Sequence, residues 1–223
     1  MDKTTNTPTS PATSDRAIQR AVRIATINAV LAAGKLQVAA PVSGFSASTG
    51  RISSAEQELS ILRKIRLEDD KEKDIMGDAE IFGIVSGLKP DMTPFVKVQD
   101  MPWLDKDKTD YKPNMDIVNW AECGAPYVNL QLFEDDDNAN LLDLGKAILN
   151  GVSTGLAAFP ATAPYALVGK IGELVLGSID SKWFKNDTDY VDSFYVIERG
   201  KTYTNHGGAA GNATVTIEPY TVR

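Results

Sequence analysis

Short segments with a period of two, separated by polar turns, constrain the fold of this chain most strongly. Successive side chains of a β-strand point to opposite faces, so apolar residues at every second position form one buried face. In four such segments the alternating apolar residues are Leu59, Ile61, Ile65 and Leu67; Ala79, Ile81 and Val85; Val128, Leu130 and Leu132; and Ala213, Val215 and Ile217. The pattern predicts an all-β fold, an antiparallel β-sandwich over residues 58–223.

One part of the chain has a helical period instead. Between Asn140 and Ile179 the apolar residues recur three and four positions apart, and two Pro-containing pairs interrupt them. The two stripes are Leu141, Leu144, Ile148 and Val152, and then Leu167, Ile171 and Leu174. We expect an α-helical hairpin, inserted into the sandwich at about residues 140–185. Because its period differs from that of the strands, a short linker in its place should leave a folded sandwich.

The N-terminal residues 1–57 are expected to lie outside the sandwich. Residues 1–14 are polar and rich in Ser and Thr, which predicts a flexible tail. Ser14 or Asp15 can cap an N-terminal helix that ends near Gly34, and residues 41–57 have the composition of a linker. The expected apolar face of this helix consists of Ile18, Ala21, Val22, Ala25 and Ala29. It could pack on its own domain or a partner, or touch a membrane.

Composition excludes several classes of function. The chain has 30 acidic and 23 basic residues and a net charge of -7, which argues against nucleic acid as a partner. Cys123 is the only cysteine and His206 the only histidine, so thiolate zinc cages and imidazole clusters are excluded. The sequence has no apolar secretory signal and no transmembrane segment. Secretion would therefore need a non-standard route or a removed segment.

Acidic residues gather in four groups at the ends of predicted strands. The groups are Asp69, Asp70, Asp74 and Asp78; Asp105, Asp107 and Asp110; Glu134, Asp135, Asp136 and Asp137; and Asp187, Asp189 and Asp192. Ca²⁺ takes about six to eight oxygen ligands, which carboxylates from neighbouring loops can supply. A single acidic group is also typical of a solvated loop, and the second group is interleaved with Lys106 and Lys108. Four groups at strand ends predict Ca²⁺ as the bound ion.

Several of these segments resemble C2-like calcium-binding domains. Asp74-Ile-Met-Gly77-Asp78 resembles the first calcium loop of that family, and Asn119-Trp120-Ala121-Glu122 is similar to its signature before a central strand. Residues 132–137 and 189–194 resemble the acidic segments of its third loop and of the next strand. The resemblance implies an eight-stranded antiparallel sandwich that binds Ca²⁺ at one tip and docks on lipid or protein. The chain departs from the family in its helical insertion and in having Ala79 where a proline is usual.

These features together predict a non-enzymatic calcium-binding module that acts in Ca²⁺-dependent binding or in structural stabilisation. The expected partners are the calcium ion and a membrane or protein surface, with no nucleic acid. The leading candidate ligands are Asp74, Asp78, Asp135, Asp137 and Asp189, followed by Asp70 and Asp192.

Two alternatives come from other classes. A membrane-active or toxin-like protein could insert the helical hairpin 140–179 into a bilayer. A serine hydrolase could use the G-x-S-x-G segment Gly151-Val-Ser153-Thr-Gly155 with a following aspartate (Asp187, Asp189 or Asp192) and His206. That motif must follow a buried strand, however, whereas the residues before it have a helical period.

Overall fold

The chain forms two four-stranded antiparallel sheets. The computed structural model describes residues 22, 24–29, 56–71, 79–135, 141–159, 163–179 and 188–222. Sheet A has the strand order β4-β1-β8-β7 and sheet B the order β3-β2-β5-β6. The strands are β1 (Gln57–Leu67), β2 (Ile81–Leu88), β3 (Pro94–Asp100), β4 (Met115–Asn119), β5 (Tyr127–Asp135), β6 (Thr188–Glu198), β7 (Tyr203–Gly207) and β8 (Ala213–Val222). The predicted predominance of antiparallel β-structure is confirmed.

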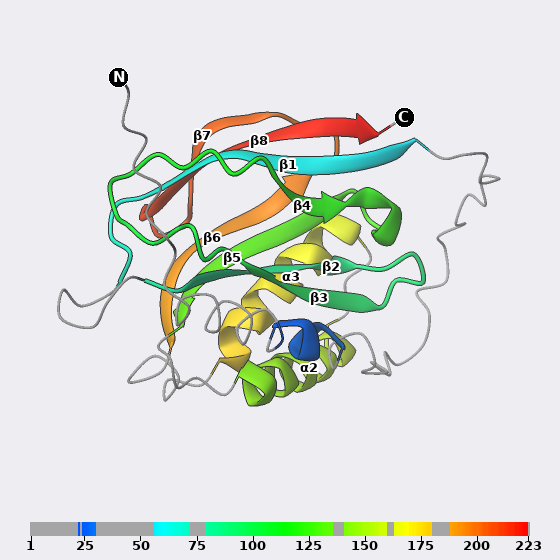
Figure 1. The fold of residues 1–223 in the computed structure, drawn as a ribbon. Helices are drawn as coiled ribbons and strands as arrows, with labels where there is room; N and C mark the ends of the chain where they lie inside the picture. Colours follow the sequence, from blue (N-terminus) through cyan, green and yellow to red (C-terminus); the bar gives the residue numbers. More distant parts are fainter. Residues whose placement is uncertain are drawn as a thin grey trace, which may run out of the picture.

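The two sheets lie face to face and share one core (Figure 1). Leu62 and Ile65 of β1 and Val215 of β8 pack in the same cluster as Val85 of β2 and Leu130 of β5. Trp120, in the short 3-10 helix η1 (Trp120–Glu122), is 2% exposed and belongs to this core. Its Nε1–H donates a hydrogen bond of 3.0 Å to Ser60 Oγ, so the ring is buried without losing its polar contact.

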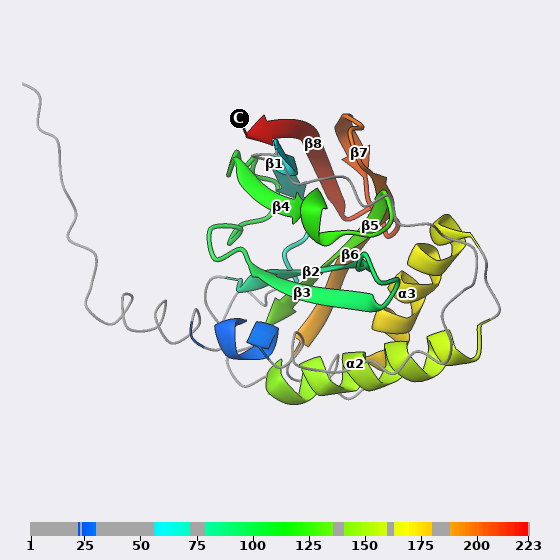
Figure 2. The same cartoon turned by 90° about the vertical axis from the view of Figure 1, so that its right-hand side faces the viewer.

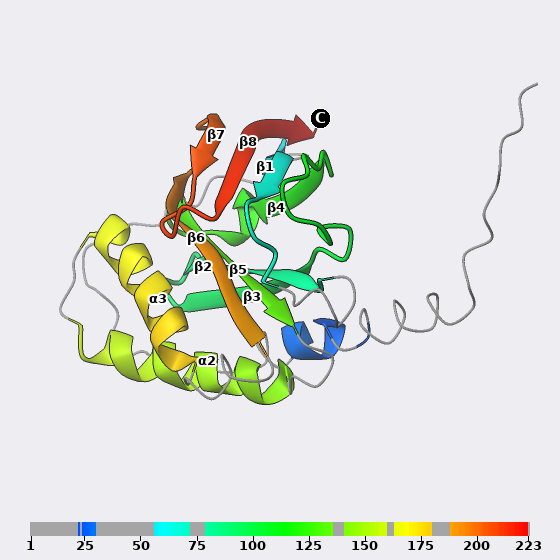
Figure 3. The same ribbon diagram turned by 90° about the vertical axis from the view of Figure 1, so that its left-hand side faces the viewer.

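Strands of the two sheets differ in how many of their faces are buried. In β8 the residues Ala213, Val215 and Ile217 are buried and those between them are half-exposed, as the period of two predicts. In β2 every residue from Ile81 to Leu88 is buried. Sheet B is buried on both faces because helices cover the side that turns away from sheet A (Figures 2 and 3).

Helices α2 (Leu141–Ala157) and α3 (Pro164–Ser178) follow β5 and precede β6 in the chain. Pro164 stands at the start of α3, where its missing N–H costs no hydrogen bond. The predicted stripes are buried at Leu144, Ile148, Val152, Leu167 and Ile171, and Leu174 is half-buried. They pack against the apolar residues Phe82, Ile84 and Phe133 of sheet B.

Two polar residues of β5 bind α3 directly. Asn129 and Gln131 alternate with the apolar residues of β5 and would face water in a bare sandwich, yet both are fully buried. Asn129 Nδ2 donates to the carbonyl oxygen of Val168 at 2.7 Å, and Gln131 Nε2 donates to that of Gly172 at 3.1 Å. These bonds attach the third layer to sheet B through backbone groups of α3.

Residues 24–29 form part of an N-terminal helix that packs beside β3 (Figure 2). Ile24 and Ile27 are buried in the core between sheet B and its helices, whereas Val22, Ala25 and Ala29 are exposed. The predicted apolar face was therefore wrong at these three positions, because the larger isoleucines turn toward the sheet. The remaining residues of that face, Ile18 and Ala21, lie outside the described residues.

Candidate functional site

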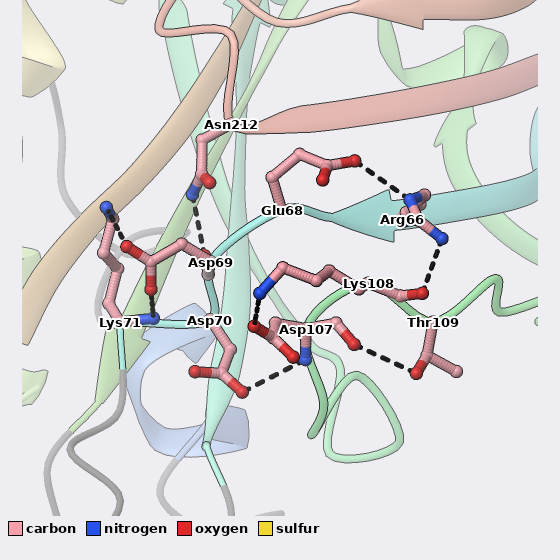
Figure 4. A network of polar contacts seen from close by, with 9 residues as sticks. All are labelled: Arg66, Glu68, Asp69, Asp70, Lys71, Asp107, Lys108, Thr109 and Asn212. Carbon is pink, nitrogen blue, oxygen red and sulfur yellow. Dashed lines mark hydrogen bonds and ion pairs between the residues drawn. The ribbon is translucent and has the colours of Figure 1, made fainter.

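Two of the acidic groups meet at the end of β1 (Figure 4). The backbone N–H of Lys108 donates to the carbonyl oxygen of Leu67 at 2.6 Å, so the loop that holds Asp107 lies beside the residues that follow β1. Asp70 accepts a 3.2 Å hydrogen bond from the backbone N–H of Asp107. Asn212, in the β7–β8 turn, donates from its side-chain amide to the carbonyl oxygen of Asp69 at 2.8 Å. Three loops thus form one polar network.

Basic residues neutralise the carboxylates of this network. The shortest N–O distances are 2.8 Å for Lys71 with Asp69, 2.7 Å for Lys108 with Asp107 and 2.9 Å for Arg66 with Glu68. The side-chain hydrogen bond from Lys71 is the largest cause that lowers the pKa of Asp69 below its usual range. The side chains of these pairs are between 33% and 65% exposed, so water screens each pair and its contribution to stability is small. The network is a mixed-charge surface rather than an anionic cage.

Asp192 of β6 holds the β7–β8 turn from inside. Its side chain is fully buried, and Oδ1 accepts from the backbone N–H of Ser193 and of Ala210, both at 2.7 Å. Oδ2 accepts from the N–H of Asn212 at 2.8 Å and of Ala213 at 2.6 Å. Four backbone donors satisfy the buried charge. This structural role was missed by sequence reasoning, which treated Asp192 as a candidate metal ligand.

The ends of three neighbouring strands lie side by side at one end of sheet B. In the β5–β6 pairing Glu134 lies opposite Asp189, and Asp135 lies opposite Thr188. On the other side of β5, Glu134 lies opposite Ile81 at the start of β2. Glu134 is only 1% exposed. The antiparallel register therefore places two acidic residues directly across from one another, where β2 begins, β5 ends and β6 begins.

The predicted ligands differ in how far they can be placed. Asp74, Asp78 and Asp137 lie outside the described residues, and the same is true of the side chains of Asp135 and Asp189. Asp70 and Asp192 are described and accept the backbone hydrogen bonds given above. Among the described residues, no three His, Cys, Asp or Glu side chains are grouped so that they could hold a metal ion.

The residues considered for a serine hydrolase lie on three different elements. Ser153 is in the middle of α2 and follows no strand, unlike the nucleophile of an elbow. His206 is exposed on β7, with its ring 5.1 Å from that of Tyr203 and 6.1 Å from that of Phe194. The carboxylate of Asp192 is engaged by the β7–β8 turn. None of these described contacts joins two members of the expected triad.

Comparison with known proteins gives a family and no function. No curated protein and no solved structure matches the chain. A family model with the description "Protein of unknown function (DUF3103)" matches residues 4–223, nearly the whole sequence. The match includes the N-terminal helical segment as well as both sheets and the helices between β5 and β6. The chain therefore belongs to the DUF3103 family.

Proposed function

We propose that this protein is a non-enzymatic, Ca²⁺-binding β-sandwich module of the C2-like kind, with helices α2 and α3 as an insertion. The observation that carries the proposal is the position of Glu134 opposite Asp189. Like charges directly opposite in an antiparallel pair destabilise a sheet, and burial of Glu134 removes the water that would screen them. A divalent cation bound at these strand ends would offset the repulsion between the two carboxylates.

The chemistry of the surrounding residues supports a hard cation. Asp78 stands three positions before the first residue of β2, and Asp137 stands two positions after the last residue of β5. Both are therefore close in sequence to the strand ends at Glu134. Carboxylate oxygens are the ligands that Ca²⁺ prefers. In this proposal the ion is held by Asp74, Asp78, Asp135, Asp137 and Asp189, with Glu134 beside them. Asp192 takes no part, because four backbone hydrogen bonds occupy both of its carboxylate oxygens. Asp70, which accepts one backbone hydrogen bond of 3.2 Å, stays a secondary candidate.

Two observations favour this module over a membrane-active protein. The described apolar residues of the α2 and α3 stripes are buried or half-buried against sheet B, so these side chains are not available to a bilayer. In the part of the chain that the structure describes, no helix is long and apolar enough to cross a membrane. A binding module needs neither a free apolar helix face nor a membrane-spanning helix. Its Ca²⁺-dependent partner would be a lipid or protein surface.

The proposal is tested by calorimetric titration of calcium into chelator-treated protein. We expect binding to the parent chain and at least a tenfold weaker affinity in Asp189→Asn, because a charged ligand becomes neutral. Asp107→Asn is the matched control, since Asp107 belongs to the lysine-paired network at the end of β1. The proposal fails if the parent chain binds no calcium or if all three proteins bind it equally.

A further inference from the structure

Strand β3 forms the outer edge of sheet B, and a side chain takes the place of a neighbouring strand there. The backbone N–H of Val98 donates to Asn28 Oδ1 at 2.8 Å, and Asn28 Nδ2 donates to the carbonyl oxygen of Val98 at 2.9 Å. The amide of Asn28 thus makes the same pair of bonds that an added strand would make. This edge is therefore able to form further backbone hydrogen bonds.

Val96 presents the next pair of backbone groups along the same edge. In an antiparallel strand the N–H and C=O of alternate residues point to the same side. Those of Val98 point away from β2, toward Asn28, so those of Val96 also point away from β2, and those of Lys97 point toward Val85. Among the described residues, no group outside sheet B bonds to the backbone of Val96. One donor and one acceptor are thus directed outward beside Asn28.

A hollow of about 470 Å³ lies along this edge. Asn28 lines it from the side of the helices, and Glu122 of η1 lines it from the side of sheet A. Between them lie Phe95, Val96 and Lys97 of β3. The volume is within the range of about 300–1,000 Å³ that is typical of ligand sites. An entering chain could therefore place one side chain in the hollow while its backbone pairs with Val96.

The charge of the hollow selects the entering side chain. Lys89 and Lys97 both line it, and neither has an ion-pair partner among the described residues. Glu122 is the acidic residue of the lining, and it accepts a hydrogen bond from Asn119 Nδ2 at 3.3 Å. Pro94 and Lys97 are residue types that protect edge strands from aggregation. They leave open the position of Val96, where the two lysines favour a carboxylate.

We propose that the outer edge of β3 binds an extended peptide by strand addition at Val96, with an acidic side chain of the peptide paired with Lys89 and Lys97. Main-chain hydrogen bonds would supply affinity and the side-chain pocket would supply selectivity, as in other edge-strand complexes. The inference is independent of the proposed calcium site. That site lies at the strand ends of sheet B, where β5 ends and β6 begins.

The test uses a displayed library of random octapeptides, panned on the full chain. We expect enriched peptides that contain an acidic residue and that bind Lys89→Glu/Lys97→Glu at least tenfold more weakly than the parent. The matched control is Lys106→Glu/Lys112→Glu, which changes the net charge equally at two exposed lysines elsewhere and should bind like the parent. Hydrogen exchange then reports on pairing. Bound peptide should slow exchange of the Val96 amide at least tenfold and leave that of Lys97 unchanged.

Four outcomes would overturn the proposal. Enriched peptides without an acidic residue, or with equal affinity for both double variants, would remove the lysine pair as the basis of selection. Unchanged exchange at Val96 would exclude strand addition. A wild-type dimer in sedimentation that Lys89→Glu/Lys97→Glu dissociates would instead assign the edge to a second copy of the chain.

Discussion

The carboxylate of Asp192 fills the space that a side chain at Gly208 would need. A Cβ atom built at Gly208 would lie 2.2 Å from Cγ of Asp192. The same carboxylate accepts the four backbone hydrogen bonds that shape the β7–β8 turn. The glycine and the aspartate therefore depend on each other, since the turn can close over the charge only where no side chain intervenes.

We expect both members of this pair to be needed for stability. Gly208→Ala should lower the free energy of unfolding by about 1–3 kcal/mol, because a carboxylate held by four bonds cannot move aside. Asp192→Asn should lower it by at least about 2 kcal/mol, because an amide has one acceptor oxygen and sets its NH₂ group against backbone donors. Urea denaturation measures both values.

A neighbouring glycine gives the control for this prediction. Gly207 has no atom within 4 Å of a built Cβ, so Gly207→Ala should change stability by less than about 0.5 kcal/mol. Equal effects of alanine at 207 and 208 would mean that the turn tolerates a side chain above Asp192.

A second prediction concerns Asp137. If it binds the ion, Asp137→Asn should weaken calcium binding at least tenfold, and it should leave the calcium-free protein equally or more stable because repulsion among the acidic residues falls. At a hundredfold excess over Kd, calcium should stabilise the parent chain by about 2.7 kcal/mol. Thermal melts with calcium and with chelator measure this gain. Identical melts of the parent under both conditions would contradict the ion site.

The strands could be predicted where only one face is buried. In β8 the apolar alternation of Ala213, Val215 and Ile217 matches the burial observed. In β5 the same alternation is present, but Asn129 and Gln131 are buried by α3 instead of facing water. Local periodicity cannot show this, because the partner groups are carbonyl oxygens some forty residues further along the chain.

A third prediction follows from this buried polar layer. The separate period of residues 140–185 suggested that a short linker could replace them. The packing now leads us to expect the opposite outcome, because removal of α2 and α3 would expose Phe82, Ile84 and Phe133 to water. Size-exclusion chromatography should show aggregation of the shortened chain. A soluble monomer with a cooperative melt would show that the helices are accessory after all.

The site was less predictable than the fold. The acidic groups are visible in the sequence, but their partners are not, since Asn212 is far in sequence from Asp69. The lysines that neutralise Asp69 and Asp107 are adjacent or nearly so, and they could have marked those groups as surface networks. Asn28 gave no signal at all, because a single polar residue in a helix does not reveal that it faces the edge of a sheet.

A fourth prediction concerns pH. Burial raises the pKa of Cys123 to about 12 from its ordinary value of 9.0. Both folded and unfolded chains hold the thiol proton below pH 9, whereas between pH 9 and 12 only the unfolded chain loses it. The free energy of unfolding should therefore fall as the pH rises through this window. Urea denaturation at pH 8 and pH 10.5 measures the decrease, and Cys123→Ala should reduce it.

Thiol reactivity gives an independent check of the same group. Because the thiolate is the nucleophile, iodoacetamide at pH 8 should modify the native chain at least a hundredfold more slowly than the urea-unfolded chain. Equal rates in the two states would mean that the fold does not protect Cys123.

The pairing of β1 with β8 has a consequence for synthesis of the chain on the ribosome. Sheet B has all its strands once β6 has emerged, and the helices that cover it have emerged by then as well. Sheet A places β1, the first strand, between β4 and β8, the last one. Until β8 leaves the exit tunnel, β1 has only β4 beside it. The core-facing side of sheet B is then covered by two paired strands of sheet A, β4 and β1, instead of four. During translation the nascent chain therefore passes through a stage in which its main core is open along the line that β8 later fills.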